Sequence, residues 1–286
     1  MSDLLAAVAG WPARTASAAL VGPEGVAATS GPIEHEFQLA SVTKPLTALA
    51  ILVAVEEEAV SLEDPADEDV VPGATLRHLL AHASGYAPDR RMRAAAVGTR
   101  RIYSNVGIER AAALVAAAAD MPFPQYLDEA VLRPLRMTST SLPGSAARDG
   151  VSTVADLARA VHELLSPTGL LSAHTLAEAT SVQFHGLRGV LPGYGGQEHN
   201  DWGLGFEIRD HKSPHWTGSR NDPSTFGHFG QSGTMLWVDP VARLGLVALA
   251  DRDFGPWAAT AWPELADTVL DAQHQPLGSD RPDVVG

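Results

Sequence analysis

The chain has 286 residues, with 20 Lys and Arg against 34 Asp and Glu, and its formal net charge is −14. A nucleic-acid surface needs clustered cations, so this balance argues against a nucleic-acid partner. The absence of cysteine excludes disulfides, thiolate metal sites and a cysteine nucleophile.

The N-terminal stretch "MSDLLAAVAGWP" lacks the basic region and the apolar core of a signal peptide. The longest apolar stretches, 46–55 and 111–119, fall well short of the ~20 residues that a membrane span requires. We therefore expect a cytoplasmic protein with no membrane partner.

The first strands are predicted before residue 40. Residues 15–22 and 25–31 have the pattern of two strands, and the turn-like "GPEG" joins them. From about residue 41 to 185, apolar residues recur at helical spacing. Helices are predicted over 44–59, 75–83, 107–120, 123–135 and 152–165.

Strand patterns return near the C-terminus. A glycine-rich passage, 189–208, leads into alternating patterns over 224–238 and 243–251. A final helix is predicted over 257–273. The tail 275–286 has little to bury and is expected to fray.

Strands from both ends of the chain thus surround a helical middle. The order predicts an α+β fold, with an antiparallel sheet built from both termini, flanked by helices and interrupted by a mostly helical subdomain. We assign residues 1–45 and 186–286 to the sheet subdomain and 46–185 to the helical one. Together they form a single domain.

One pair of residues suggests nucleophilic chemistry. In "ASVTKPL", Ser41 precedes Lys44 by three positions, which places both on one face of a helix. Pro45 suits a first helical turn. Burial and the positive helix N-terminus lower the pKa of Lys44, and a neutral lysine can take the proton of Ser41. Taken alone, the motif also fits a surface serine beside a lysine that extends its amine into water.

Two further motifs decide between these interpretations. "RIYSNVG" contains Tyr103 and Asn105, and "FGHFGQSGT" contains His228 on a predicted strand. With "LASVTKPLTALAI", they resemble the active-site motifs of the serine β-lactamase and penicillin-binding-protein superfamily. The resemblance is to class C β-lactamases and their esterase and D-alanyl-peptidase relatives, and it runs from about residue 38 to 251.

The resemblance implies a role for each matching position. Ser41 is the nucleophile that becomes acylated, and Lys44 and Tyr103 form its base. A phenol beside an ammonium can ionise below its usual pKa, so which of Lys44 and Tyr103 takes the proton stays open. The backbone N–H groups of Ser41 and Gln231 form the oxyanion hole. The other substrate-binding positions are Asn105, His228, Phe229 and Gly230.

The third motif departs from the family pattern. His228 and Phe229 replace the lysine and threonine of K-T-G, which bind the carboxylate of β-lactams and D-alanyl peptides. We therefore expect a carboxylesterase acting on small or medium acyl esters. The first alternative is a β-lactamase or D-alanyl-D-alanine-type peptidase, and the second is a catalytically silent binding protein. The complete set of Ser41, Lys44, Tyr103 and Asn105 argues against silence.

Histidine pairs elsewhere do not form a metal motif. His78 and His82 are four residues apart, but the glutamate of H-E-x-x-H is missing. Pro214 separates His211 from His215 in an expected loop. We expect no metal and no cofactor, and the partner is a small-molecule ester or amide.

Overall fold

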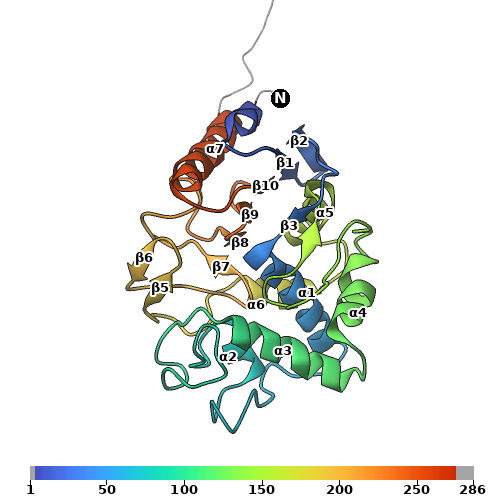
Figure 1. Ribbon diagram of the computed structural model, residues 1–286, viewed down its shortest axis with the longest axis vertical. Helices are drawn as coiled ribbons and strands as arrows, with labels where there is room; N and C mark the ends of the chain where they lie inside the picture. Colours follow the sequence, from blue (N-terminus) through green and yellow to red (C-terminus); the bar gives the residue numbers. More distant parts are fainter. Residues whose placement is uncertain (1–3, 275–286) are drawn as a thin grey trace, which may run out of the picture.

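A six-stranded antiparallel sheet forms the centre of the molecule (Figure 1). The computed structural model describes residues 4–274, so the expected fraying of 275–286 lies outside the described residues. The strand order is β2-β1-β10-β9-β8-β7. The strands are β1 Ala16–Gly22, β2 Gly25–Ser30, β7 Glu207–Ile208, β8 Phe226–Gly230, β9 Thr234–Asp239 and β10 Leu244–Ala250.

The two ends of the chain meet where β1 pairs with β10. Their register runs from Ala16 opposite Ala250 to Val21 opposite Gly245. This pairing confirms the predicted α+β fold with a sheet built from both termini. Every residue of β8, β9 and β10 is buried. Helices cover both faces of the sheet at these strands, so the side chains on both faces are largely apolar.

The helices are α1 Thr43–Glu56, α2 Leu76–Leu80, α3 Asn105–Ala118, α4 Phe123–Leu127, α5 Val154–Leu165, α6 Ala173–Ala179 and α7 Pro256–His274. The predicted helix over 123–135 is instead one α-helical segment followed by a π-helical turn, Asp128–Leu132. Four short strands pair outside the main sheet: β3 Phe37–Gln38 with β4 Val151–Ser152, and β5 Gly189–Leu191 with β6 Gly195–Gln197.

Two apolar cores lie on the two faces of the sheet. Trp237 of β9 packs with Trp262 of α7 on one face. Val247 of β10 and Val161 of α5 belong to the larger core on the other face, which also surrounds α1. Apolar residues lie on all sides of α1 and most of its residues are buried, which is the pattern of a core helix. The division into two subdomains stays a prediction, and α5, assigned to the helical part, packs on the sheet.

Within residues 4–274, no helix combines the length and the apolar character that crossing a membrane requires.

Candidate active site

Ser41 lies in a tight turn between the sheet and the central helix. The prediction placed it on the first turn of α1, but it sits in a 3₁₀ turn, Ala40–Val42, directly before that helix. Ala40 has a φ of 46°, a left-handed conformation that costs about 1–3 kcal/mol for a residue with a Cβ atom. The surrounding structure must therefore hold this turn in place.

The turn between β8 and β9 supplies that support. The Thr234 hydroxyl donates to the Leu39 carbonyl at 2.7 Å, and the Ser232 hydroxyl donates to the Gln38 carbonyl at 2.6 Å. Gly230 allows the close approach, because a Cβ there would lie 2.3 Å from the Leu39 carbonyl oxygen. These contacts place the backbone of Gln231 beside Ser41 in one pocket.

Lys44 lies fully buried under Ser41, with 0% of its surface exposed. Its Nζ is 3.1 Å from Ser41 Oγ, 2.7 Å from Asn105 Oδ1 and 2.8 Å from the Ala147 carbonyl oxygen. A neutral amine has two N–H groups and one lone pair. Asn105 and Ala147 can only accept hydrogen bonds here, so they take both N–H groups, and the lone pair is left for the hydroxyl of Ser41.

The electrostatic surroundings favour that neutral form. Burial, with the Arg148 guanidinium adding to it, lowers the pKa of Lys44 to about 7, against the opposing charges of Asp89 and Glu109. The predicted lowering of this pKa thus agrees with the structure. Near neutral pH, an appreciable fraction of Lys44 can accept a proton.

Tyr103 approaches Ser41 from the other side. Its hydroxyl donates to Ser41 Oγ at 2.6 Å, and Lys44 Nζ lies 4.5 Å from the centre of its ring. Burial raises the pKa of Tyr103 well above its usual value. The sequence left open which of the two groups takes the proton. Because the ring is shielded from water, the structure favours Tyr103 as a hydrogen-bond donor and Lys44 as the proton acceptor.

The segment around Tyr103 is fixed by hydrogen bonds to its neighbours. Ser104 caps α3, since its hydroxyl oxygen accepts from the Gly107 N–H at 3.0 Å. The Ser104 N–H donates to His82 Nδ1 at 3.2 Å. The rings of His82 and Trp202 pack against Tyr103. His82 therefore positions the second motif.

His228 faces Tyr103 from β8. Its Nε2 lies 3.4 Å from the Tyr103 hydroxyl, while Nδ1 donates to the Phe229 carbonyl at 2.7 Å. Burial, together with the nearby Lys44, lowers the pKa of His228 to about 3. The position where many relatives carry lysine is thus uncharged at neutral pH.

Phe229, next on the strand, turns its side chain to the other face of the sheet. Its ring centre lies 4.9 Å from that of Phe254 and 6.0 Å from those of Tyr194 and Trp262. It is 7% exposed, and it also lines the pocket beside Ser41. Phe229 therefore forms part of an apolar wall and offers no hydroxyl.

A pocket of about 210 Å³ opens above Ser41. It brings together most of the residues that the sequence singled out, with Lys44 beneath it and Gly230 in the supporting strand. Leu191, Pro192, Trp202 and Glu207 were not predicted. The full lining is Ser41, Tyr103, Asn105, Leu191, Pro192, Trp202, Glu207, His228, Phe229 and Gln231.

Glu207 brings a carboxylate to this wall. Its Oε1 lies 3.0 Å from Lys212 Nζ and 2.9 Å from His215 Nε2, and its Oε2 accepts from the Trp216 indole. Burial would raise the pKa of Glu207, but Lys212 and His215 together hold it well below its usual range. Among these residues, the sequence predicts a loop for His215 alone, and nothing in the spacing of Glu207, Lys212 and His215 signals the cluster.

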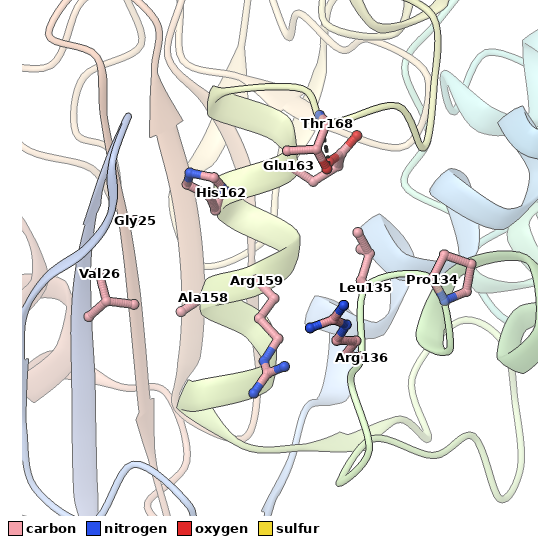
Figure 2. A pocket seen from close by; sticks show the side chains of 10 residues that line it. All are labelled: Gly25, Val26, Pro134, Leu135, Arg136, Ala158, Arg159, His162, Glu163 and Thr168. Atoms are coloured by element: carbon pink, nitrogen blue, oxygen red, sulfur yellow. Dashed lines mark hydrogen bonds between the residues drawn. The ribbon is translucent and has the colours of Figure 1, made fainter.

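A larger hollow of about 410 Å³ lies elsewhere, between β2, α5 and residues 134–136 (Figure 2). Arg136 and Arg159 extend into it. Its buried carboxylate, Glu163, already accepts hydrogen bonds from the backbone N–H groups of Thr168, Gly169 and Leu170. None of Ser41, Lys44 and Tyr103 lines this hollow.

Comparison with known proteins agrees with this geometry. The model of a protein family described as beta-lactamase matches residues 13–270. The chain belongs to the β-lactamase family. Its members are hydrolases of the serine β-lactamase fold, and the predicted family resemblance is thereby confirmed.

Solved structures extend the comparison. A β-lactamase from Mycobacterium bovis is 53% identical with a TM-score of 0.92, and the match covers 95% of this chain and 100% of that one. Simvastatin synthase from Aspergillus terreus is 16% identical with a TM-score of 0.80, covering 96% and 97% of the two chains. EstCE1, a hydrolase with promiscuous acyltransferase activity, is 17% identical with a TM-score of 0.77, covering 93% and 96%. The last two likenesses are of fold alone.

A curated relative from Escherichia coli K12, assigned as a D-alanyl-D-alanine carboxypeptidase, is 23% identical over 226 residues. The match covers 64% of this chain and 51% of the relative. The chain thus spans about half the length of the curated relatives it matches.

Proposed function

We propose that the protein is a carboxylesterase that hydrolyses small or medium acyl esters through an acyl-enzyme on Ser41. The observation that carries the proposal is the arrangement around Lys44 Nζ. Asn105 Oδ1 and the Ala147 carbonyl, at 2.7 and 2.8 Å, occupy its N–H groups and leave its lone pair for Ser41. A base in this state can activate a serine hydroxyl.

In the acylation step, the Ser41 proton passes to Lys44 Nζ as Oγ bonds to the ester carbonyl carbon. The Tyr103 hydroxyl, at 2.6 Å from Oγ, stabilises the charge that develops there. The backbone N–H groups of Ser41 and Gln231 bind the carbonyl oxygen, and one such donor is typically worth about 3 kcal/mol. The ester C–O bond then breaks, and the alcohol leaves with the proton that Lys44 held.

Deacylation repeats these steps with water in place of Ser41. Lys44, neutral again, takes a proton from the water that attacks the acyl carbonyl. The Ser41–acyl bond breaks, Oγ regains a proton from Lys44, and the carboxylic acid departs. The ester, water, Ser41 and Lys44 account for every bond and proton in the reaction.

The pocket supports small substrates. Its volume of about 210 Å³ and its apolar wall of Leu191, Trp202 and Phe229 suit a short, uncharged acyl chain. A second hollow of about 360 Å³ shares Tyr103 and Pro192 with it. The alcohol portion has room there, next to the phenol.

Hydrolysis of β-lactams or D-alanyl peptides is the second candidate, because relatives carry the names β-lactamase and D-alanyl-D-alanine carboxypeptidase. The site favours it less. A substrate carboxylate would meet His228, whose pKa is about 3, and Phe229, which has no hydroxyl.

One substrate panel tests the proposal. It comprises 4-nitrophenyl acetate, butyrate and palmitate, a chromogenic cephalosporin and a D-alanyl-D-alanine peptide, each given to the wild type and to Ser41→Ala. We expect the two short esters to be hydrolysed fastest and Ser41→Ala to be inactive. No ester hydrolysis by the wild type, or equal rates in Ser41→Ala, would overturn the assignment.

A further inference from the structure

A buried ion cluster closes one side of the pocket. Glu207 stands on β7 opposite Gly227 of β8, so it adjoins the strand that carries His228. It is 2% exposed and lines the same pocket as Ser41. Among the residues that line this pocket, it is the one with a formal charge.

The cation of the cluster, Lys212, has all its hydrogen bonds to groups of the protein. Lys212 Nζ lies 3.0 Å from Glu207 Oε1, 3.2 Å from the Asp201 carbonyl oxygen, and within hydrogen-bond distance of the Ile208 carbonyl. An ammonium has three N–H groups, and these three acceptors use them all. Lys212 does not line the pocket, so it is not free to bind a carboxylate there.

The negative charge of Glu207 is close enough to Tyr103 and His228 to affect their pKa values. Burial dominates the pKa of both Tyr103 and His228, and the negative charge of Glu207 raises each of them. The pocket therefore meets the negative end of the Glu207–Lys212 pair. In a water-poor site such a charge is only weakly screened.

Building on the proposed esterase function, we propose that Glu207 determines specificity by repelling substrates whose acyl group carries a carboxylate. It places a negative charge in the wall of the pocket that contains Ser41. Substrates with an uncharged acyl group are unaffected. Glu207 is thus a specificity residue that takes no part in proton transfer.

The test compares two esters with the same leaving group and acyl chains of equal length. They are 4-nitrophenyl hexanoate, which is neutral, and the mono-4-nitrophenyl ester of adipic acid, which ends in a carboxylate. The rate with Ser41→Ala is subtracted as background. We expect Glu207→Gln to raise the adipate-to-hexanoate ratio of kcat/KM by about tenfold or more. The variant removes the repulsion between Glu207 and the substrate carboxylate, and it leaves the positive charge of Lys212 without its counter-ion.

Two further variants separate charge from structure. Glu207→Gln with Lys212→Met removes both charges, and we expect a smaller rise in the same ratio. Lys212→Met alone leaves the carboxylate uncompensated and should leave the ratio unchanged or lower it. If Glu207→Gln does not fold, the double variant carries the test.

A ratio unchanged within twofold in the folded variants that lack the Glu207 carboxylate, with hexanoate still hydrolysed by the wild type, would overturn the inference about Glu207 alone. A wild type that hydrolyses neither ester would overturn the proposed esterase function, and the inference with it.

Discussion

At the residue scale, the state of Lys44 determines how the protein should respond to pH. Only the neutral amine can take the Ser41 proton, and burial lowers its pKa to about 7. Below that pH the protonated fraction grows, so kcat/KM for a short ester should fall about tenfold per pH unit and level off above it. His228, with a pKa of about 3, adds no second step near neutrality. If kcat/KM did not change between pH 5 and 9 while acylation was rate-limiting, Lys44 would not be the titrating base.

A neighbouring charge offers a directional test of the same assignment. Arg148 is one of the groups that lower the pKa of Lys44, after burial itself. Replacing it by glutamine should therefore move the acidic limb of the profile to higher pH. Arg133→Gln is the matched control, since Arg133 pairs with Asp128 on the surface. A limb that stays in place, or that moves equally in the control, would count against Lys44 as the titrating base.

Tyr103 should contribute through its hydrogen bond rather than through ionisation. Tyr103→Phe removes the hydroxyl that donates to Ser41 Oγ at 2.6 Å, and we expect kcat/KM to fall by about 10²–10⁴-fold. Since burial keeps the phenol protonated, the midpoint of the pH profile should persist in the variant. Disappearance of the acidic limb would instead identify Tyr103 as the titrating group.

At the element scale, we expect β8 to set the preference between neutral and anionic substrates. A carboxylate entering the site loses the two contacts that K-T-G would offer, each commonly worth about 1.5–3 kcal/mol. Short neutral esters should therefore have at least about a hundredfold higher kcat/KM than a cephalosporin. His228→Lys with Phe229→Thr should narrow that ratio, measured by steady-state kinetics on both substrates.

An equal or higher kcat/KM for the cephalosporin in the wild type would contradict that prediction. The carboxylate would then need another cation. Arg209 bonds to the Gly218 and Asp210 carbonyls, and Arg252 bonds to the Pro12 carbonyl. Neither lines the pocket around Ser41.

The contact between β8 and the nucleophile turn can be tested at Gly230. A Cβ atom there would lie 2.3 Å from the Leu39 carbonyl oxygen and 2.4 Å from Thr234 Oγ1. Gly230→Ala must push the strand from the turn, at a cost of about 1–3 kcal/mol. We expect a lower Tm and a large loss of esterase activity. Gly10→Ala, where a Cβ meets nothing within 4 Å, is the control. Full activity in Gly230→Ala would show that this spacing is not required.

At the scale of the whole molecule, most of the long helices and strands could be predicted from local sequence patterns. The hairpin of β1 and β2 follows from its turn residues, and α1, α3, α5 and α7 follow from helical spacing. The pairing of β1 with β10 could be inferred from strands at both ends of the chain. The short elements β3 to β7 and α6 were missed, since each is too short to show a period.

The parts of the site that could not be predicted depend on residues distant in sequence. Lys44 bonds to the carbonyl of Ala147, a backbone atom that carries no sequence signal. The cluster of Glu207, Lys212 and His215 needs a folded loop to bring its charges together. The protonation state of Tyr103 could not be predicted, because motif spacing reveals neighbours but not burial, and burial dominates the pKa of this residue.

In the proposed reaction Ser41, activated by Lys44, is the residue that becomes acylated. Intact-protein and peptide mass spectrometry after treatment with a fluorophosphonate tests it most directly. We predict a single adduct on Ser41 in the wild type, none in Ser41→Ala, and strongly reduced labelling in a folded Lys44→Ala variant. An adduct on another residue, or undiminished labelling of Ser41→Ala, would show that Ser41 is not the nucleophile.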